Sequence, residues 1–254
     1  MNSAHFNPAC LAEESFTDMC RLVTELAGGK TQALTDFATL YDGGFPGFNW
    51  YSRLVFGTLS EEQLPEAASL LSDVRLPLVS FTTQHVPAGL PAVLKKAGYQ
   101  LRVEQTGMLL DLPVKDEETD PHIVRMERKD MDLWSDTVAR AFEKPDDRPA
   151  FYLMSEQPDC FFYAWLENGT PVGTTLLYTS HANAGIHEVG VFKEHRRKGI
   201  ARALVSHALR QAVSDGASVS TLQASPVGKA LYATMGYTEV SSIQNWFCPR
   251  KLQG

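Results

Sequence analysis

The sequence predicts an α/β or α+β fold, and its composition and its alternating patterns both support that class. Hydrophobic residues make up 44% of the 254 residues and charged residues 21%, which is typical of a folded globular chain. Helical and strand patterns alternate through residues 123–254, as expected of strands covered by helices. At about 150 residues per domain, the length allows one large domain or two small ones.

An acidic segment divides the sequence into two halves. Residues 111–120 read D-L-P-V-K-D-E-E-T-D, and their five acids and single lysine cannot build a hydrophobic core. Proline residues bound the segment at both ends. We therefore predict an N-terminal domain at residues 1–112, a linker at 113–121 and a C-terminal domain at 122–254.

A helix opens the patterned part of the C-terminal half. Asp130 belongs to a residue type that caps helices, and apolar residues follow it at helical spacing. The predicted apolar stripe consists of Trp134, Val138, Ala141 and Phe142.

Three strands are predicted to follow this helix. Residues 161–166 and 172–179 are rich in β-formers, and the Asn168-Gly169 pair between them is a strong hairpin signal. A loop at 180–185 then leads into a third strand at 186–191. The first two strands are therefore expected to be antiparallel.

A basic turn joins the third strand to the next helix. That helix begins after Gly199 and ends at Asp215-Gly216, because glycine commonly closes a helix. Residues 218–224 read as the next strand. Ser225-Pro226 supplies a cap and a first-turn proline for a short helix that ends at Gly236.

The basic turn has the properties of a phosphate site. A helix N-terminus leaves about four backbone N–H groups unpaired and carries about half a positive charge. Gly199 would let a ligand approach the backbone, and the side chains of Arg196, Arg197 and Lys198 would add charge-assisted hydrogen bonds. Taken alone, the same residues would also fit a solvated basic turn.

A second block turns this pattern into a family resemblance. A strand ending in V-x-V, then R-x-x-G-x-A, then L-Y-x-x-x-G-Y at residues 231–237 resembles the GNAT superfamily of acyl-CoA-dependent N-acetyltransferases. The resemblance covers about residues 123–237. It implies a GNAT fold, with a mixed central sheet flanked by helices, and acetyl-CoA as cosubstrate without a metal.

The resemblance also implies which residues bind the cofactor. The turn would hold the pyrophosphate of CoA, and the preceding strand would pair with the pantetheine arm. The implied cofactor-binding residues are Val189, Gly190, Val191, Arg196, Arg197, Lys198, Gly199, Ile200, Ala201, Ser225 and Gly228. Ser225 and Gly228 stand where many members of the family have Asn and Ala. Tyr232 would protonate the departing thiolate, although a tyrosine among apolar residues also fits a packing role.

Two candidates for the general base lie next to each other on the strand before the turn. His187 and Glu188 should point to opposite faces, so at most one faces the substrate unless the strand carries a bulge. His187 is the first choice, because an ordinary histidine pKa near 6.5 suits proton removal at neutral pH. Glu188 is the alternative, and a water relay could replace both.

The N-terminal half contains a partial copy of the second block. Residues 92–99 align with 230–237, and both segments read as helices closed by Gly-Tyr. Leu94 replaces the tyrosine, and no R-x-x-G-x-G/A turn precedes it. We expect a degenerate GNAT-like domain, although a helix ending in glycine can also arise by chance. Residues 45–51 are a candidate aromatic wall of the acceptor pocket.

Charge and hydropathy argue against several other functions. The 23 Lys and Arg residues against 30 Asp and Glu residues give a net charge of −7, which repels polyanions. No run of about 18 apolar residues occurs, and the first residues lack the pattern of a signal peptide. We expect a cytoplasmic protein that binds neither nucleic acid nor membranes.

The four cysteines predict no metal site. They form no C-x-x-C pair and have no histidine at zinc-ligand spacing, so reduced packing thiols are expected. These residues are Cys10, Cys20, Cys160 and Cys248.

The resemblance therefore implies an acyltransferase that moves the acetyl group of acetyl-CoA directly to a primary amine, with Tyr232 as general acid. The acceptor is expected to be a small molecule rather than a protein, and the acidic net charge favours cationic amines. The alternative is a non-catalytic acyl-CoA-binding regulatory or interaction module. The sequence does not indicate whether the protein forms oligomers.

Overall fold

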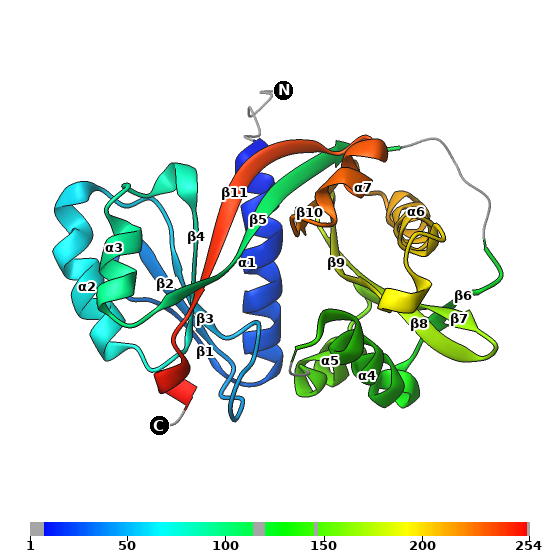
Figure 1. The fold of residues 1–254 in the computed structure, drawn as a ribbon, viewed down its shortest axis with the longest axis horizontal. Coiled ribbons are helices and arrows are strands. Elements are labelled where there is room, and N and C mark those ends of the chain that lie inside the picture. The colour runs from blue at the N-terminus through cyan, green and yellow to red at the C-terminus, as the bar shows by residue number, and fades with distance from the viewer. Residues whose placement is uncertain (1–7, 114–119, 145–146, 253–254) are drawn as a thin grey trace.

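The structure, a computed structural model, describes residues 8–113, 120–144 and 147–252 (Figure 1). The strands within these ranges form one mixed sheet of 11 strands in the order β1-β2-β3-β4-β11-β5-β10-β9-β8-β7-β6. Helices flank this sheet, so the predicted fold class is confirmed.

The N-terminal half begins with a long helix, and short strands and two more helices come after it. They are α1 (Pro8–Leu26), β1 (Lys30–Ala33), β2 (Ala38–Asp42), β3 (Arg53–Phe56), α2 (Leu64–Asp73), β4 (Leu78–Thr82), α3 (Leu90–Lys96) and the long β5 (Gln100–Asp111).

The elements of the C-terminal half carry the longer strands. They are β6 (Ile123–Met126), α4 (Met131–Phe142), α5 (Arg148–Met154), β7 (Cys160–Glu167), β8 (Thr170–Ser180), β9 (Asn183–Val191), α6 (Ile200–Ser214), β10 (Val219–Ala224), α7 (Lys229–Thr234) and β11 (Thr238–Phe247).

The last strand of each half lies against the other half. β5 pairs with β10 and β11, whereas β11 pairs with β4 and β5, and all of these pairs are antiparallel. Figure 1 shows the two strands running together between the halves. The two halves also resemble each other in their parallel strand pairs. β3 pairs with β4 in the N-terminal half, β9 pairs with β10 in the C-terminal half, and both pairs are parallel.

The cores reflect this exchange of strands. Trp246 of β11 is buried in the cluster that α2 and α3 form over the N-terminal strands. Met108 and Leu110 of β5 are buried in the cluster around α6. Each half therefore completes its core with a strand from the other half. β11, which follows α7, completes the N-terminal core, and β5, which follows α3, completes the C-terminal core.

Both faces of the C-terminal sheet are covered. Phe161 and Tyr163 of β7 pack in the cluster around α6, whereas Phe162 and Ala164 pack with α4, α5 and α1. Alternate residues of a strand point to opposite faces. α6 therefore covers one face, and the other three helices cover the opposite one.

Most predicted local elements are confirmed, with shifted ends. Asn168 and Gly169 connect β7 to β8 with φ values of 50° and 77°, which a two-residue hairpin requires. The predicted loop at 180–185 is mostly strand, because Asn183 already pairs with Ser180 and Val219. Phe142 is 42% exposed and does not complete the apolar stripe of α4.

The two predicted helix caps differ in detail from the structure. Asp130 stands at the N-cap position of α4, but its carboxylate accepts the N–H of Glu127 (3.0 Å) in the preceding short 3₁₀ turn and not an N–H of α4. The hydroxyl of Ser225 accepts the N–H of Gly228 (3.2 Å) within a turn. As a result, α7 begins only at Lys229.

Parts of the sequence predictions lie outside the described residues. Residues 114–119 of the predicted linker are among them, and the domain boundaries stay a prediction. Cys20, Cys160 and Cys248 are buried free thiols, as predicted, whereas the side chain of Cys10 is not described. None of the helices in the described ranges has the length and apolar character to span a membrane.

Candidate active site

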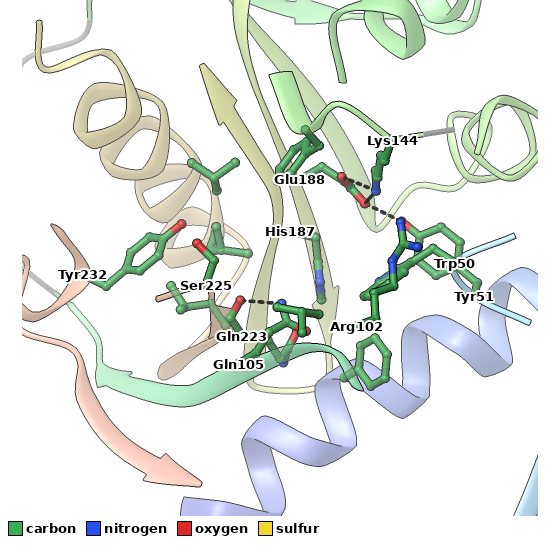
Figure 2. Close-up of a pocket in the computed structure, with 16 residues that line it drawn as sticks. Trp50, Tyr51, Arg102, Gln105, Lys144, His187, Glu188, Gln223, Ser225 and Tyr232 are labelled. Carbon is green, nitrogen blue, oxygen red and sulfur yellow. Dashed lines mark hydrogen bonds and ion pairs between the residues drawn. The ribbon is translucent and has the colours of Figure 1, made fainter. Parts of the chain in front are cut away.

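The candidate site is a pocket that opens where two parallel strands separate. β9 and β10 pair only from Asn183 with Val219 to Ile186 with Leu222, although β9 continues to Val191. A cavity of about 410 Å³ lies beyond the last pair. Its walls include both strands, α1, β5, α7 and the segments around residues 50 and 144 (Figure 2).

A β-bulge in β9 shapes this pocket. The register between β8 and β9 shifts between Thr174 and Leu176, which face Gly190 and His187. Glu188 has a φ of 49°, unusual for a residue other than glycine, and the hydroxyl of Thr174 donates to its carbonyl (2.9 Å). The bulge interrupts the alternation of side chains, so both His187 and Glu188 line the pocket.

The carboxylate of Glu188 lies in a buried cluster of polar groups. The ammonium of Lys144 donates to it at 3.1 Å, and the hydroxyl of Tyr51 donates at 3.4 Å. Asp147 lies 3.6 Å from the same ammonium. Burial raises the pKa of Asp147 to about 6, against the lowering effect of Lys144 and with help from Glu188. The cluster therefore joins the two halves of the chain.

Tyr51 belongs to a loop of the N-terminal half that is fixed on both sides. The N–H of Trp50 donates to Asp147 (2.7 Å), and the guanidinium of the buried Arg53 donates to the carbonyl of Trp50. Burial, followed by the nearby carboxylates of Glu188 and Asp147, raises the pKa of Tyr51 well above its ordinary value. Tyr51 consequently remains a hydrogen-bond donor to Glu188.

His187 is a weaker base than its residue type suggests. Burial lowers its pKa to about 4, so the ring is neutral at pH 7. Its Nε2 atom is buried and has no hydrogen-bond partner within the described residues. The ring packs over Gly185, where a Cβ would lie 2.6 Å from Nε2. His187 was the first choice for the general base because of an ordinary histidine pKa, and in the folded protein its pKa is lower than that.

Tyr232 lies at the other end of the pocket from Glu188 (Figure 2). Burial raises its pKa well above the ordinary value, which keeps the hydroxyl protonated. Its ring packs edge to face against Tyr237, with centroids 5.9 Å apart. Gly228 leaves room for this ring, because a Cβ there would lie 3.1 Å from it. Ser225 lines the pocket beside Tyr232, whereas Gly228 does not.

The basic turn has the expected backbone but an unexpected arginine. Arg197 and Gly199 have φ values of 65° and 85°, and the 15-residue helix α6 begins directly after them. The guanidinium of Arg196 donates to the carbonyls of Val191 (2.9 Å) and Ala141 (3.3 Å). These bonds fix part of the guanidinium of Arg196 on the backbone, and its predicted role in binding phosphate stays a prediction.

The other predicted cofactor residues divide into two groups. Val189 and Ser225 line the pocket together with the three candidate catalytic residues. The turn from Arg196 to Ala201 is not part of the pocket lining, and Lys198 lies 3.6 Å from Glu167. Within the described ranges, no group of three or more His, Cys, Asp and Glu side chains is placed to hold a metal ion.

Several residues of the pocket were not predicted from the sequence. Lys144, Arg102 and Gln105 line it from segments outside the recognised motifs. Trp50 and Tyr51 belong to the aromatic segment 45–51, which was a candidate wall on account of its composition. No pattern in the sequence marks the first three, because they meet the motif residues only through the strand exchange and the end of α4.

A comparison with known protein families finds a match over the region that holds these motifs. The model of the acetyltransferase (GNAT) family matches residues 131–237, from the start of α4 to Tyr237. The chain contains a GNAT acetyltransferase domain. This GNAT domain holds the diverging strands, the bulge, the basic turn and Tyr232, and its family supports acetyl transfer in general.

Solved structures extend the similarity of fold beyond the GNAT domain. A GCN5-related N-acetyltransferase from Kribbella flavida has a TM-score of 0.68 and 15% identity, over 94% of this chain and 95% of its own. One from Sphaerobacter thermophilus has a TM-score of 0.56 and 17% identity, over 92% of each chain.

A third structure of this fold is a functionally unknown conserved protein from Staphylococcus epidermidis. Its TM-score is 0.64 at 14% identity, over 86% of this chain and 93% of its own. At these identities the likeness shows the fold alone. The shared fold extends over the N-terminal half of this chain, which is also GNAT-like. None of the curated proteins compared with the chain matches it.

Proposed function

We propose that the protein transfers the acetyl group of acetyl-CoA to a primary amine in the pocket between β9 and β10. One observation carries this proposal: a carboxylate and a protonated tyrosine, both from the GNAT domain, occupy opposite ends of a single cavity. These are Glu188, bonded to Lys144 and Tyr51, and Tyr232, held protonated by burial. Acetyl transfer needs a proton acceptor for the amine and a proton donor for the thiolate.

The residues present fit acetyl-CoA. Beyond Ile186, the edge of β9 that faces β10 pairs with no strand of the described residues, so its peptide groups are available to the amides of a pantetheine arm. At the far end, Gly199 and the first turn of α6 offer N–H groups with no helical partner, which suit a pyrophosphate. Arg197 and Lys198 are exposed beside them and add positive charge.

The reaction balances with the groups at hand. The amine nitrogen forms a bond to the acetyl carbon, and the bond between that carbon and sulfur breaks. The nitrogen loses a proton toward Glu188, directly or through a water molecule, and the sulfur gains one from Tyr232. Glu188 is the preferred base, because the lowered pKa of His187 makes that ring a poor proton acceptor at neutral pH.

The first test is the thermal stability of the protein with and without saturating acetyl-CoA. A ligand that binds the native state raises its stability in proportion to RT ln(1 + [L]/Kd), so we expect an increase of several degrees in Tm. No shift at millimolar acetyl-CoA would refute the cofactor site. A panel of amines, assayed by release of CoA, then measures transfer.

The second test separates catalysis from binding. Tyr232→Phe should lower turnover by about 10-fold or more and leave the Tm shift with acetyl-CoA nearly intact. Tyr237→Phe is the matched control, because Tyr237 bonds Ser220 (2.7 Å) and does not line the pocket. An unchanged rate in Tyr232→Phe would remove Tyr232 from the mechanism. Binding of acetyl-CoA without transfer to any amine would favour a non-catalytic module.

A further inference from the structure

We propose that the amine acceptor carries a carboxylate close to its amino group, and that Arg102 binds this carboxylate. The inference rests on the proposed acetyl transfer in the same pocket and names the chemical class of its acceptor. An α-amino acid is the simplest molecule of this class.

Arg102 reaches the acceptor end of the pocket from the exchanged strand β5. In Figure 2 its side chain extends toward Trp50, Tyr51 and Glu188, away from the end that holds Tyr232. Because the thiolate of CoA is expected beside Tyr232, the amine must approach from the side of Glu188. Arg102 therefore lies where the body of the acceptor would lie, not where the cofactor would.

Two aromatic rings hold the guanidinium of Arg102 without using its N–H groups. Its Cζ atom lies 5.1 Å from the ring centroid of Phe48 and 5.4 Å from that of Phe247. Such cation–π contacts engage the face of the guanidinium and leave its edge free. That edge is the planar fork that matches a carboxylate through two parallel hydrogen bonds.

Arg102 has no ion pair or hydrogen bond with any other residue that the structure describes. Lys144, the other cation of the pocket, is bonded to Glu188 and lies near Asp147. Glu188 is in turn the one carboxylate in the described lining of the pocket. Lys144 is thus shared between Glu188 and the buried Asp147, and Arg102 is the cation of the described lining that has no ion pair.

The neutral state of His187 strengthens this conclusion. Burial lowers its pKa to about 4, so it adds no charge to the pocket at pH 7. A polyamine would bring a second ammonium group toward Arg102 and would be repelled. The earlier expectation of cationic acceptors rested on the net charge of the whole chain, which does not describe the charge of this pocket.

The apolar lining suggests what surrounds the two charged groups. Phe16, Trp50 and Phe142 contribute aromatic surface to the same cavity. An acceptor whose carboxylate meets Arg102 and whose amine meets Glu188 would place its remaining atoms against these rings. Amino acids with apolar side chains are therefore the preferred members of the class.

The experiment compares amino acids with the amines obtained by removing their carboxylates. We would measure kcat/KM for acetyl transfer to L-phenylalanine and phenethylamine, and to L-lysine and cadaverine. The amino acid of each pair should be preferred. The pair of O-phosphoethanolamine and ethanolamine shows whether a phosphate is bound instead of a carboxylate, and a preference for phosphate would overturn the assignment of a carboxylate.

Variants of Arg102 then assign the preference to this side chain. Arg102→Gln should lower kcat/KM for the amino acids by about 10- to 100-fold, mainly through KM, and should not lower it for phenethylamine or cadaverine. Arg102→Lys keeps the charge and should recover part of the loss. Arg75→Gln is the control, because Arg75 is exposed and does not line the pocket.

The outcomes separate this inference from the proposed function. Absence of a Tm shift with acetyl-CoA would count against the function itself. A wild-type protein that acetylates the decarboxylated amines equally well or better would overturn the inference and leave the function standing. Calorimetry with the CoA-saturated protein gives a readout without turnover, and failure of every carboxylate-bearing amine to bind would also overturn the inference.

Discussion

Asp147→Asn should change how the stability of the protein depends on pH. The side chain of Asp147 is fully buried, and its Oδ1 atom accepts the N–H of Trp50 at 2.7 Å. Burial raises the pKa of this carboxyl from 3.8 to about 6, in spite of Lys144. Asparagine keeps an acceptor for Trp50 but cannot titrate, so the variant isolates the cost of ionising Asp147.

The sign follows from the raised pKa. The folded state holds the proton of Asp147 more tightly than the unfolded state, so this group stabilises the fold below about pH 4. That contribution disappears as the pH rises through about 6. At about 1.4 kcal/mol per pKa unit, the difference in unfolding free energy between Asp147→Asn and wild type should grow by about 3 kcal/mol across this window.

Urea denaturation followed by circular dichroism, at a series of pH values from 4 to 7.5, measures this difference. Only its change with pH is diagnostic, because the substitution also alters contacts at every pH. Asp132→Asn is the control: its hydrogen bond with Arg148 holds the pKa of Asp132 below the ordinary value of 3.8, so this carboxyl is ionised in both states above about pH 5 and its difference from wild type should stay nearly constant there. Parallel curves for wild type and Asp147→Asn would refute the reasoning.

Two further predictions concern the base and the turn. Glu188→Gln should reduce acetyl transfer by about 10²- to 10⁴-fold, whereas His187→Gln should reduce it by less than about 10-fold, both measured by CoA release; the reverse order would make His187 the base. Arg196→Ala should lower the unfolding free energy by about 1–2 kcal/mol in urea denaturation, through its lost bonds to Val191 and Ala141. Calorimetry should then find acetyl-CoA affinity reduced less by Arg196→Ala than by Arg197→Ala, and equal losses would contradict this distinction.

Local backbone features could be predicted from the sequence because particular residue types favour them. Asn168 and Gly169 adopt the positive φ values of a hairpin turn, and Gly98 and Gly236 do so after α3 and α7. The two Gly-Tyr endings also predicted the internal repeat. In each half a strand follows this ending, and those strands are the ones that pair at the centre of the sheet.

The bulge in β9 could not be predicted in the same way. Glu188 sits in an ordinary strand pattern, and its residue type does not favour a positive φ. A hydrogen bond from Thr174 on the neighbouring strand helps to hold it there, and that contact exists only after the sheet has formed. A prediction based on alternation therefore chose between His187 and Glu188, although the structure exposes both to the pocket.

The polar neighbours of Glu188 could not be predicted from the sequence for a different reason. Lys144 bonds Glu188 across 44 positions of sequence, and Tyr51 bonds it across 137. Neither residue belongs to a motif, and both arrive through packing of the N-terminal loop and the end of α4. The pKa of His187 was misjudged for the same reason, because its burial depends on tertiary contacts.

The exchange of β5 and β11 makes the two halves one cooperative unit. Removing β11 would expose the hydrogen-bonding edge of β4 and take Trp246 out of the N-terminal core. Removing β5 would expose the edge of β10 beside the pocket. A half produced alone would therefore lack a strand, part of a core and one wall of the pocket. The N-terminal half, which has no phosphate turn of its own, is thus a structural component of the site it adjoins.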